Sequence, residues 1–292
     1  MKREAALGYL IIVLLLGSLA VSLALPAVGV TPRAQLTFPE EFLKGFGKMA
    51  GGKGELLKVF ERKASEVPQV GELCLVLDVS GGGVEVKECS GDFVYRVEVY
   101  TSKWWFGKAG EGAKYDVRDE VADGSMTLTV TGSGVQLVVE VNPLLISVID
   151  VDLSGGGIYI DLSSGNLKEF SLDGAGCGSE INLRGLNSTK VELGVSGGGF
   201  EALLEYGEVR DSPTLAVNVD AGGGEVTVKL PSGVKVSATG KASAGSLEIS
   251  VEDLGEISIS HGSKTLEDSG FTEGLIVSAS VSAGGVEITV ER

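Results

Sequence analysis

Apolar and polar residues alternate along most of this chain after residue 73, and short glycine runs interrupt the alternation. The clearest example is the stretch IDVDLSGGGIYIDL. Apolar residues occupy every second position on both sides of its three glycines, namely Ile149, Val151, Leu153, Ile158, Ile160 and Leu162. Alternation with a period of two predicts a half-buried β-strand on each side. Because glycine tolerates φ > 0 and has no side chain, the run between the strands predicts a sharp corner.

This strand–corner–strand unit recurs at nearly constant spacing. From residue 134 the corners fall at positions 134, 157, 178, 199, 224, 245 and 285, so the steps are 23, 21, 21, 25, 21 and 40 residues. We interpret the last step as two stacked units, and a further copy, LVLDVSGGGVEV, opens the series. A period near 21 residues predicts an all-β, glycine-rich β-solenoid, in which neighbouring units stack to bury their apolar faces. The predicted repeat domain spans residues 73–292.

Each corner has two possible geometries. In a hairpin the two strands pair with each other, whereas in an arch they belong to two facing sheets. Cys74 and Cys89 distinguish the two, because they lie symmetrically about the corner at residues 80–83. In a hairpin they would be cross-strand neighbours within reach of a disulfide, which an oxidising compartment would permit. In an arch they would lie on opposite outer faces without a bond, and Cys177 is left as a small residue near a corner.

The N-terminus carries an uncharged, mainly apolar stretch of nineteen residues, Leu7–Leu25, preceded by Lys2 and Arg3. This length is close to the ~20 residues of a membrane-spanning helix, and the basic flank predicts that the following chain lies outside the cytoplasm. Within residues 1–30 a cleaved signal peptide is the alternative, with cleavage near Ala24, but the length of the stretch favours an anchor. We expect a single-pass cell-membrane protein with an extracytoplasmic C-terminal domain.

Residues 31–72 differ from both flanking regions. The segments FPEEFLKGFGKM and ELLKVFERKASEV place apolar residues at helical spacing, and Gly51, Gly52 and Gly54 separate them. This pattern predicts a juxtamembrane stalk with one or two short helices. A linker without regular structure is the alternative for the same residues.

An insertion near residues 100–125 interrupts the repeat and carries the densest aromatic cluster, Trp104, Trp105 and Phe106. We expect a longer hairpin here that caps one end of the stack, because solenoids need their open ends covered. The alternative is an exposed aromatic patch that binds a glycan or a protein partner.

The net charge of −16 argues against nucleic-acid binding, because an acidic surface is repelled by phosphate backbones. The glycine runs do not indicate a phosphate-binding loop either, since a strand rather than a helix follows each of them. His261 is the only histidine and lies in a polar, turn-like stretch. A single histidine gives little support for a zinc site or for a Ser-His-Asp catalytic triad. We expect no cofactor and no catalytic activity.

Acidic residues recur beside the corners, at Asp78, Asp152, Asp161, Asp220 and Glu225. They invite comparison with calcium-binding β-rolls, but the nonapeptide spacing of that motif is missing. A solvated acidic face is the expected alternative. The tripeptide Asn187-Ser188-Thr189 matches the acceptor pattern for N-glycosylation, which fits a surface turn.

The spaced SGGG units resemble the putative-adhesin family of unknown function and its toast-rack and LiaF-like relatives. The stretch VNVDAGGGEVTVKLPSGVKVSATGKASAGSLEIS, Val217–Ser250, carries the resemblance most clearly. The similarity covers roughly residues 73–292 and is one of repeat style. It implies a β-solenoid on the cell surface or membrane with a non-catalytic role, and it supplies no active-site residues. The aromatic insertion departs from the family pattern.

Three functions are compatible with these features. The first is a membrane-anchored adhesin or envelope scaffold that presents a surface to a protein or glycan partner. The second is an envelope-stress regulator that binds a sensor protein in the membrane. The third is an enzyme acting on polysaccharides, for which no carboxylate pair stands out. The anchor, the repeat and the sparse catalytic inventory favour the first.

Overall fold

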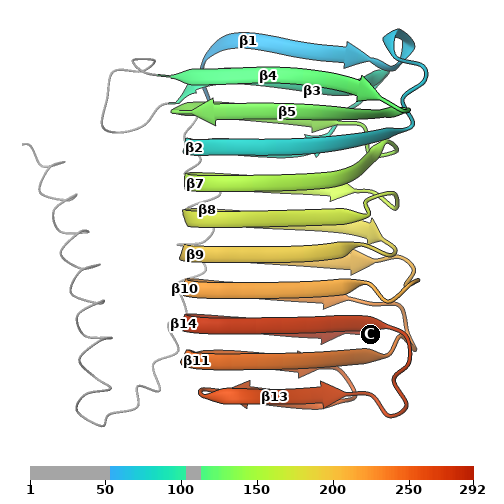
Figure 1. The fold of residues 1–292 in the computed structure, drawn as a ribbon, viewed down its shortest axis with the longest axis vertical. Helices are drawn as coiled ribbons and strands as arrows, with labels where there is room; N and C mark the ends of the chain where they lie inside the picture. Colours follow the sequence, from blue (N-terminus) through green and yellow to red (C-terminus); the bar gives the residue numbers. More distant parts are fainter. Residues whose placement is uncertain (1–52, 103–112) are drawn as a thin grey trace, which may run out of the picture. The chain divides into compact units, whose positions relative to one another are not determined.

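The computed structural model describes residues 53–102 and 113–292, which form an all-β arrangement (Figure 1). Its strands are β1 (Lys53–Lys63), β2 (Glu72–Glu88), β3 (Phe93–Ser102), β4 (Lys114–Ala122), β5 (Ser125–Ser133), β6 (Val135–Val141), β7 (Ile146–Ser163), β8 (Glu169–Leu186), β9 (Lys190–Tyr206), β10 (Thr214–Lys229), β11 (Val236–Val251), β12 (Gly255–Ile259), β13 (Gly262–Glu267) and β14 (Leu275–Glu291). Within the described part of the chain, the one helical segment is the 3-10 turn η2 (Ala64–Glu66). The prediction of an all-β domain is confirmed for these residues.

The expected membrane-spanning stretch, Leu7–Leu25, lies outside the described residues. Between residues 53 and 292, leaving aside 103–112, we find no helix with the length and apolar character needed to cross a bilayer.

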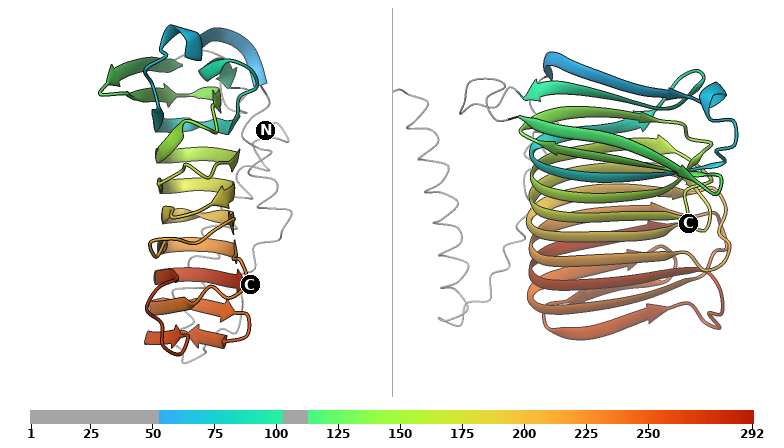
Figure 2. Two further views of the ribbon diagram at one scale, coloured as in Figure 1. Left: turned by 90° about the vertical axis from the view of Figure 1, so that its right-hand side faces the viewer. Right: turned by 45° about the horizontal axis from the view of Figure 1, so that its top comes forward.

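Seven long strands, each bent at a small-residue corner, form the body of the stack. In spatial order they are β2, β7, β8, β9, β10, β14 and β11. We call each a coil, and we call the parts before and after its corner the first and second arms. Neighbouring coils pair in parallel through both arms; β7 and β8, for example, are in register from Val148↔Glu169 to Ser163↔Arg184. The two arms of a coil do not pair with each other, so each corner is an arch, and Figure 2 shows the coils as U-shaped ribbons.

The two arms of each coil face each other across the apolar core. The alternating positions around Gly155–Gly157 are buried as their pattern predicts, with exposed fractions of 0–1% for Ile149, Val151, Leu153, Ile158, Ile160 and Leu162. Contacts across the core are tight. A Cβ atom at Gly240, in the first arm of β11, would lie 2.7 Å from Cδ2 of Leu247 in the second arm. Burial of these apolar faces drives the stacking, because one coil alone leaves its inner face in water.

The corners require glycine for two reasons. Gly156 in β7 has φ +106°, and Gly284 in β14 has φ +117°, a region that L-residues with side chains rarely adopt. In addition, a Cβ atom at Gly156 would clash with the carbonyl oxygen of Gly82 in the neighbouring coil, and one at Gly284 would clash with the carbonyl oxygen of Gly222. The glycine corners therefore allow adjacent backbones to stack at strand spacing.

The coils from β7 to β10 stack in sequence order, but the ends do not. Gly157 pairs with Gly178, and Gly178 with Gly199, which is an offset of 21 residues each time. At the N-terminal end, β2 lies between β7 and the pair β5–β6. At the C-terminal end, the last strand β14 lies between β10 and β11.

The final step of 40 residues contains a second unit, as expected, but this unit does not continue the parallel stack. The intervening residues form β12 and β13, which run antiparallel to the second and first arms of β11. These two strands occupy the outer edge of β11, so its other edge is the one that pairs with β14. The step is long because the chain makes this antiparallel cap before returning to the stack.

Antiparallel strands also cover the N-terminal end of the stack. β4 pairs with β5, while β3 pairs with β6 and β1 pairs with β3. β1 and β4 meet through an edge-to-face contact between Phe60 and Tyr115, 6.4 Å between ring centroids, and a bidentate ion pair between Arg62 and Asp119, 2.8 Å at its shortest. A charged pair at the end of the core makes further strand addition unfavourable.

The helical stalk predicted within residues 31–72 is wrong for its described part. The segment ELLKVFERK forms most of β1, and only η2 follows it. Apolar residues at helical spacing do not decide the structure here, because β3 offers a free edge. Pairing with that edge places Phe60 against the apolar core. Tertiary pairing thus overrides a local helical pattern.

The structure also answers the question raised by the cysteines. Because β2 is an arch, Cys74 and Cys89 belong to opposite arms, and both are free thiols. Cys74 Sγ lies 3.9 Å from the hydroxyl of Ser125, and the Cys89 thiol donates to the carbonyl oxygen of Phe93 at 3.4 Å. Of the two alternatives, the structure has the arch, and the disulfide that a hairpin would have permitted is absent.

Candidate binding surfaces

A column of five glutamates runs along the outer face of the second arms. In-register pairing places them on consecutive coils from β8 to β11, in the order Glu180, Glu201, Glu225, Glu287 and Glu248. We call this column the glutamate ladder. Neighbouring strands lie about 4.8 Å apart, so each carboxylate has a like charge on the next coil. Like charges directly opposite each other destabilise a sheet.

The positions on both sides of the ladder are uncharged. Toward the corner lie Gly178, Gly199, Gly223, Gly285 and Ser246, and away from it lie Asn182, Leu203, Thr227, Thr289 and Ser250. The corner side therefore presents little more than backbone. The ladder is a line of negative charge on an otherwise neutral strip of the sheet.

Outside the ladder, some carboxylates on the outer faces are neutralised by a neighbouring coil. Asp161 on β7 pairs with Arg184 on β8 at 2.6 Å, and Lys190 on β9 pairs with Glu169 on β8 at 3.0 Å. Among the described residues, no ion pair within 4.0 Å involves Glu180 or Glu201, and the same holds for Glu287 and Glu248. Glu180, Glu201, Glu287 and Glu248 thus differ from these two carboxylates, whose charges are paired with a neighbouring coil.

The environment of Glu248, at one end of the ladder, disfavours its charged form. Burial of its carboxyl group, followed by the nearby charges of Glu256 and Glu287, raises the pKa of Glu248 above its ordinary value. A raised pKa in the folded state means that ionisation of this group opposes folding. Its contribution to stability is present below the unfolded-state pKa of about 4.3 and is lost as the pH rises through the folded-state pKa.

We expect Glu248→Gln to stabilise the protein at pH 7 relative to the wild type. At pH values below about 4 the two should be equally stable, since the wild-type carboxyl is then protonated in both states. Urea midpoints measured at pH 3.5 and pH 7 test this. Glu55→Gln, which removes one charge at the opposite end of the stack, should not reproduce the pH-dependent gain. An equal pH dependence for wild type and Glu248→Gln would contradict the prediction.

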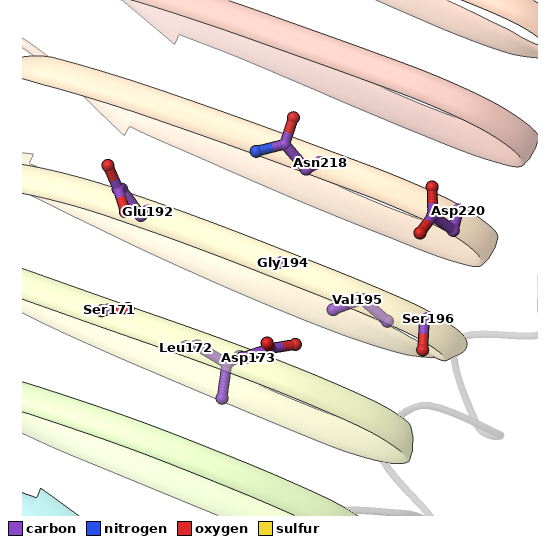
Figure 3. A pocket seen from close by; sticks show the side chains of 9 residues that line it. All are labelled: Ser171, Leu172, Asp173, Glu192, Gly194, Val195, Ser196, Asn218 and Asp220. Carbon is purple, nitrogen blue, oxygen red and sulfur yellow. The ribbon is translucent and has the colours of Figure 1, made fainter.

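A shallow hollow of about 330 Å³ lies on the outer face of the first arms (Figure 3). It forms because Gly194 on β9 has no side chain, while its neighbours in register are Asp173 on β8 and Asn218 on β10. Its lining residues are Ser171, Leu172, Asp173, Glu192, Gly194, Val195, Ser196, Asn218 and Asp220. The lining is mainly polar and acidic, and it can offer hydrogen bonds to a small polar ligand or to a side chain of a partner protein.

The acidic residues predicted from the sequence fall on four different outer columns. Asp78 and Asp152 are stacked with Asp173 in the column that leads to the hollow. Asp220 lines the hollow itself and accepts a hydrogen bond of 3.2 Å from the hydroxyl of Ser282. Asp161 is held by Arg184, and Glu225 belongs to the ladder. Across residues 53–102 and 113–292, no three metal-ligating side chains converge on one point.

The remaining candidates lie on surface turns or outside the described residues. His261 sits in the turn between β12 and β13, with Nδ1 3.1 Å from the carbonyl oxygen of Ser243. The amide of Asn187 donates to the carbonyl oxygen of Gly165 at 3.0 Å, and the buried Thr189 hydroxyl donates to Leu167. Both groups of the acceptor tripeptide are therefore engaged in hydrogen bonds in the folded chain. The aromatic cluster Trp104–Phe106 lies outside the described residues, between β3 and β4.

The ladder itself was missed by sequence reasoning, although the signal is present. A glutamate follows the last small residue of the corner by two positions in CGSEINL, GGGFEALL, AGSLEISV and AGGVEITV. In β10 it follows the last glycine directly, because Gly224 aligns with Phe200. In β11, Ser246 takes the place of the last glycine, so the copies line up only when the register of the strands is known.

Comparison with known proteins gives little additional information. No protein-family model matches the chain, and no curated protein matches it. One solved structure that resembles it is the crystal structure of a putative cell adhesion protein from Clostridium sporogenes, with 14% sequence identity and a TM-score of 0.49. The similarity covers 81% of this chain and 100% of that one. We base no argument about function on this likeness.

Proposed function

We propose that this protein is a non-catalytic surface protein of the cell envelope, an adhesin or scaffold, that binds a basic protein surface through the glutamate ladder. The observation that carries the proposal is the ladder: five carboxylates in register on consecutive coils, with uncharged positions on both sides. Carboxylates held in line about 4.8 Å apart repel one another, and a cationic partner relieves that repulsion on binding. The stack holds these charges on a rigid sheet, which lowers the entropic cost of binding.

The sequence supports a location at the envelope. The apolar stretch Leu7–Leu25 with its basic flank favours a membrane anchor, which would hold the repeat domain on the outside of the cell. The resemblance of the repeats to adhesin-like proteins points to the same compartment. Together they favour a protein that displays its sheet faces to partners at the cell surface.

Binding of full-length protein to immobilised poly-L-lysine tests the role of the ladder. We expect binding that weakens steeply with salt, since exposed charges contribute most of it. A variant with Glu180, Glu201, Glu287 and Glu248 changed to Gln should bind about tenfold more weakly, because four surface charge contacts together are worth about 1.4 kcal/mol.

The matched control removes four carboxylates elsewhere, through Glu55→Gln, Glu120→Gln, Asp123→Asn and Glu273→Gln. It has the same net charge as the ladder variant, so it should bind within about twofold of the wild type if the ladder is the binding surface. Equal weakening of both variants would show that net charge alone governs binding, and the ladder would then not be a specific surface.

A further inference from the structure

The last strand of the chain fills a gap that the preceding strands leave open. After β10 the chain passes to β11 without placing it beside β10. β14 then enters between them and pairs in parallel with both, through 15 residue pairs on each side. Figure 1 shows β14 in this interior position. Without β14, both β10 and β11 would present an open edge along their full length.

The gap is closely matched to β14. Leu275, Val277, Val281 and Ile288 are at most 1% exposed, so they complete the apolar core between the neighbouring coils. The match extends to the corner, where Gly284 approaches the backbone of Gly222 so closely that any Cβ atom would clash. A strand that fills the gap must therefore be an arch as long as β10 and β11, with glycine where its corner approaches Gly222. Residues 275–291 meet both requirements.

The connection to β14 is held by polar contacts, mainly with Lys235, with the backbone of Val236 and with Arg292. Residues 268–274 lead from β13, at the outer edge, to the start of β14. The Lys235 ammonium group donates to the carbonyl oxygen of Gly270 at 2.6 Å, and Arg292 forms an ion pair with Asp268 at 3.1 Å. However, Nε and Nη2 of Arg292 are buried without a hydrogen-bond partner. The cost of burying these two donors offsets part of the stabilisation that the ion pair with Asp268 provides.

We propose that residues 275–292 form an exchangeable strand, and that β14 of one molecule can fill the gap of a second copy. The contacts of β14 with β10 and β11 are the same whether the strand comes from the same chain or from another. Only the course of residues 268–274 differs, and such an exchange is a low-cost route to association. The coils β8 and β9 are joined directly by the short connection 187–189, so neither can exchange in this way without moving the rest of the stack.

Disulfide trapping between full-length chains tests the exchange. Asn218 on β10 and Ser280 on β14 are adjacent in register, and strand spacing suits a disulfide. In a background with Cys74→Ser and Cys89→Ser, one chain carries Asn218→Cys and a second, of different tag size, carries Ser280→Cys. The two are unfolded together, refolded and oxidised. We expect a disulfide-linked heterodimer whose share rises with the protein concentration during refolding.

The control pair is Ser171→Cys and Glu192→Cys, which are adjacent in register on the interior coils β8 and β9. This pair should give no heterodimer. Heterodimers in equal yield from both pairs would reveal random collision and overturn the proposal. Light scattering of the unsubstituted protein after the same refolding gives an independent result. A monomer at every concentration would overturn the proposal as well, whatever the cysteine pairs show.

Discussion

A chain that ends at Gly274 should fail to fold. The truncation removes β14 and leaves β10 and β11 unpaired along the edges that face each other. It also removes six large apolar side chains that are at most 4% exposed: Leu275, Val277, Val281, Val286, Ile288 and Val290. Burial of each such side chain contributes about 1.5–3 kcal/mol, so their sum is comparable to the whole stability of an ordinary domain, about 5–15 kcal/mol.

Circular dichroism during urea titration measures this effect. The truncated chain should show no cooperative transition, whereas the full chain should show one. A matched control retains the strand and changes only outward positions of β14, through Ile276→Ser and Ser278→Ala, and it should unfold as the full chain does. If the truncated chain unfolds cooperatively at the same urea concentration as the full chain, then β10 and β11 can pair directly, and β14 is dispensable.

The second large effect is expected at the corner of β7, where Gly155 and Gly156 offer a direct comparison. Both have positive φ, +68° and +106°. A Cβ atom at Gly155 meets no other atom within 4 Å, whereas one at Gly156 would clash with the carbonyl oxygen of Gly82. Gly155→Ala should therefore cost about 1–2 kcal/mol for backbone conformation alone. Gly156→Ala should cost more than about 4 kcal/mol, because backbone atoms on two coils would have to separate.

The free energies of unfolding of these two variants, obtained from urea titrations, distinguish the clash from the backbone effect. Equal losses would mean that adjacent corners can move apart without cost. In that case the close approach of the coils would not be what requires glycine, and the conformation at φ > 0 would be a sufficient explanation.

The sequence predicts which side chains of each coil face the core, because burial follows the alternation of apolar and polar residues along the strand. Ile158, Ile160 and Leu162 are buried as predicted, and Gly156 adopts the expected positive φ. These features depend on interactions that each coil repeats with its neighbours. The corner type could not be read in the same way, since hairpins and arches require the same alternation of apolar residues and the same glycines.

Other features depend on which edges are free, and the local sequence does not record this. The segment from Lys53 to Lys63 carries a helical pattern but becomes β1, because the edge of β3 is available for pairing. The position of β14 between β10 and β11 depends on β12 and β13 having covered the other edge of β11. The glutamate ladder has a local signal in each copy, but its alignment through β10 and β11 depends on the register of the strands.

The antiparallel strands at both ends have a consequence for how such a molecule changes its length during evolution. Duplicating a repeat at either terminus would place a parallel coil against an edge built for antiparallel pairing, or against the Arg62–Asp119 ion pair. The coils β7 to β10, however, present the same register to both neighbours. Length should therefore vary by gain or loss of whole coils in the middle of the gene, in increments of about 4.8 Å, while both caps are inherited unchanged.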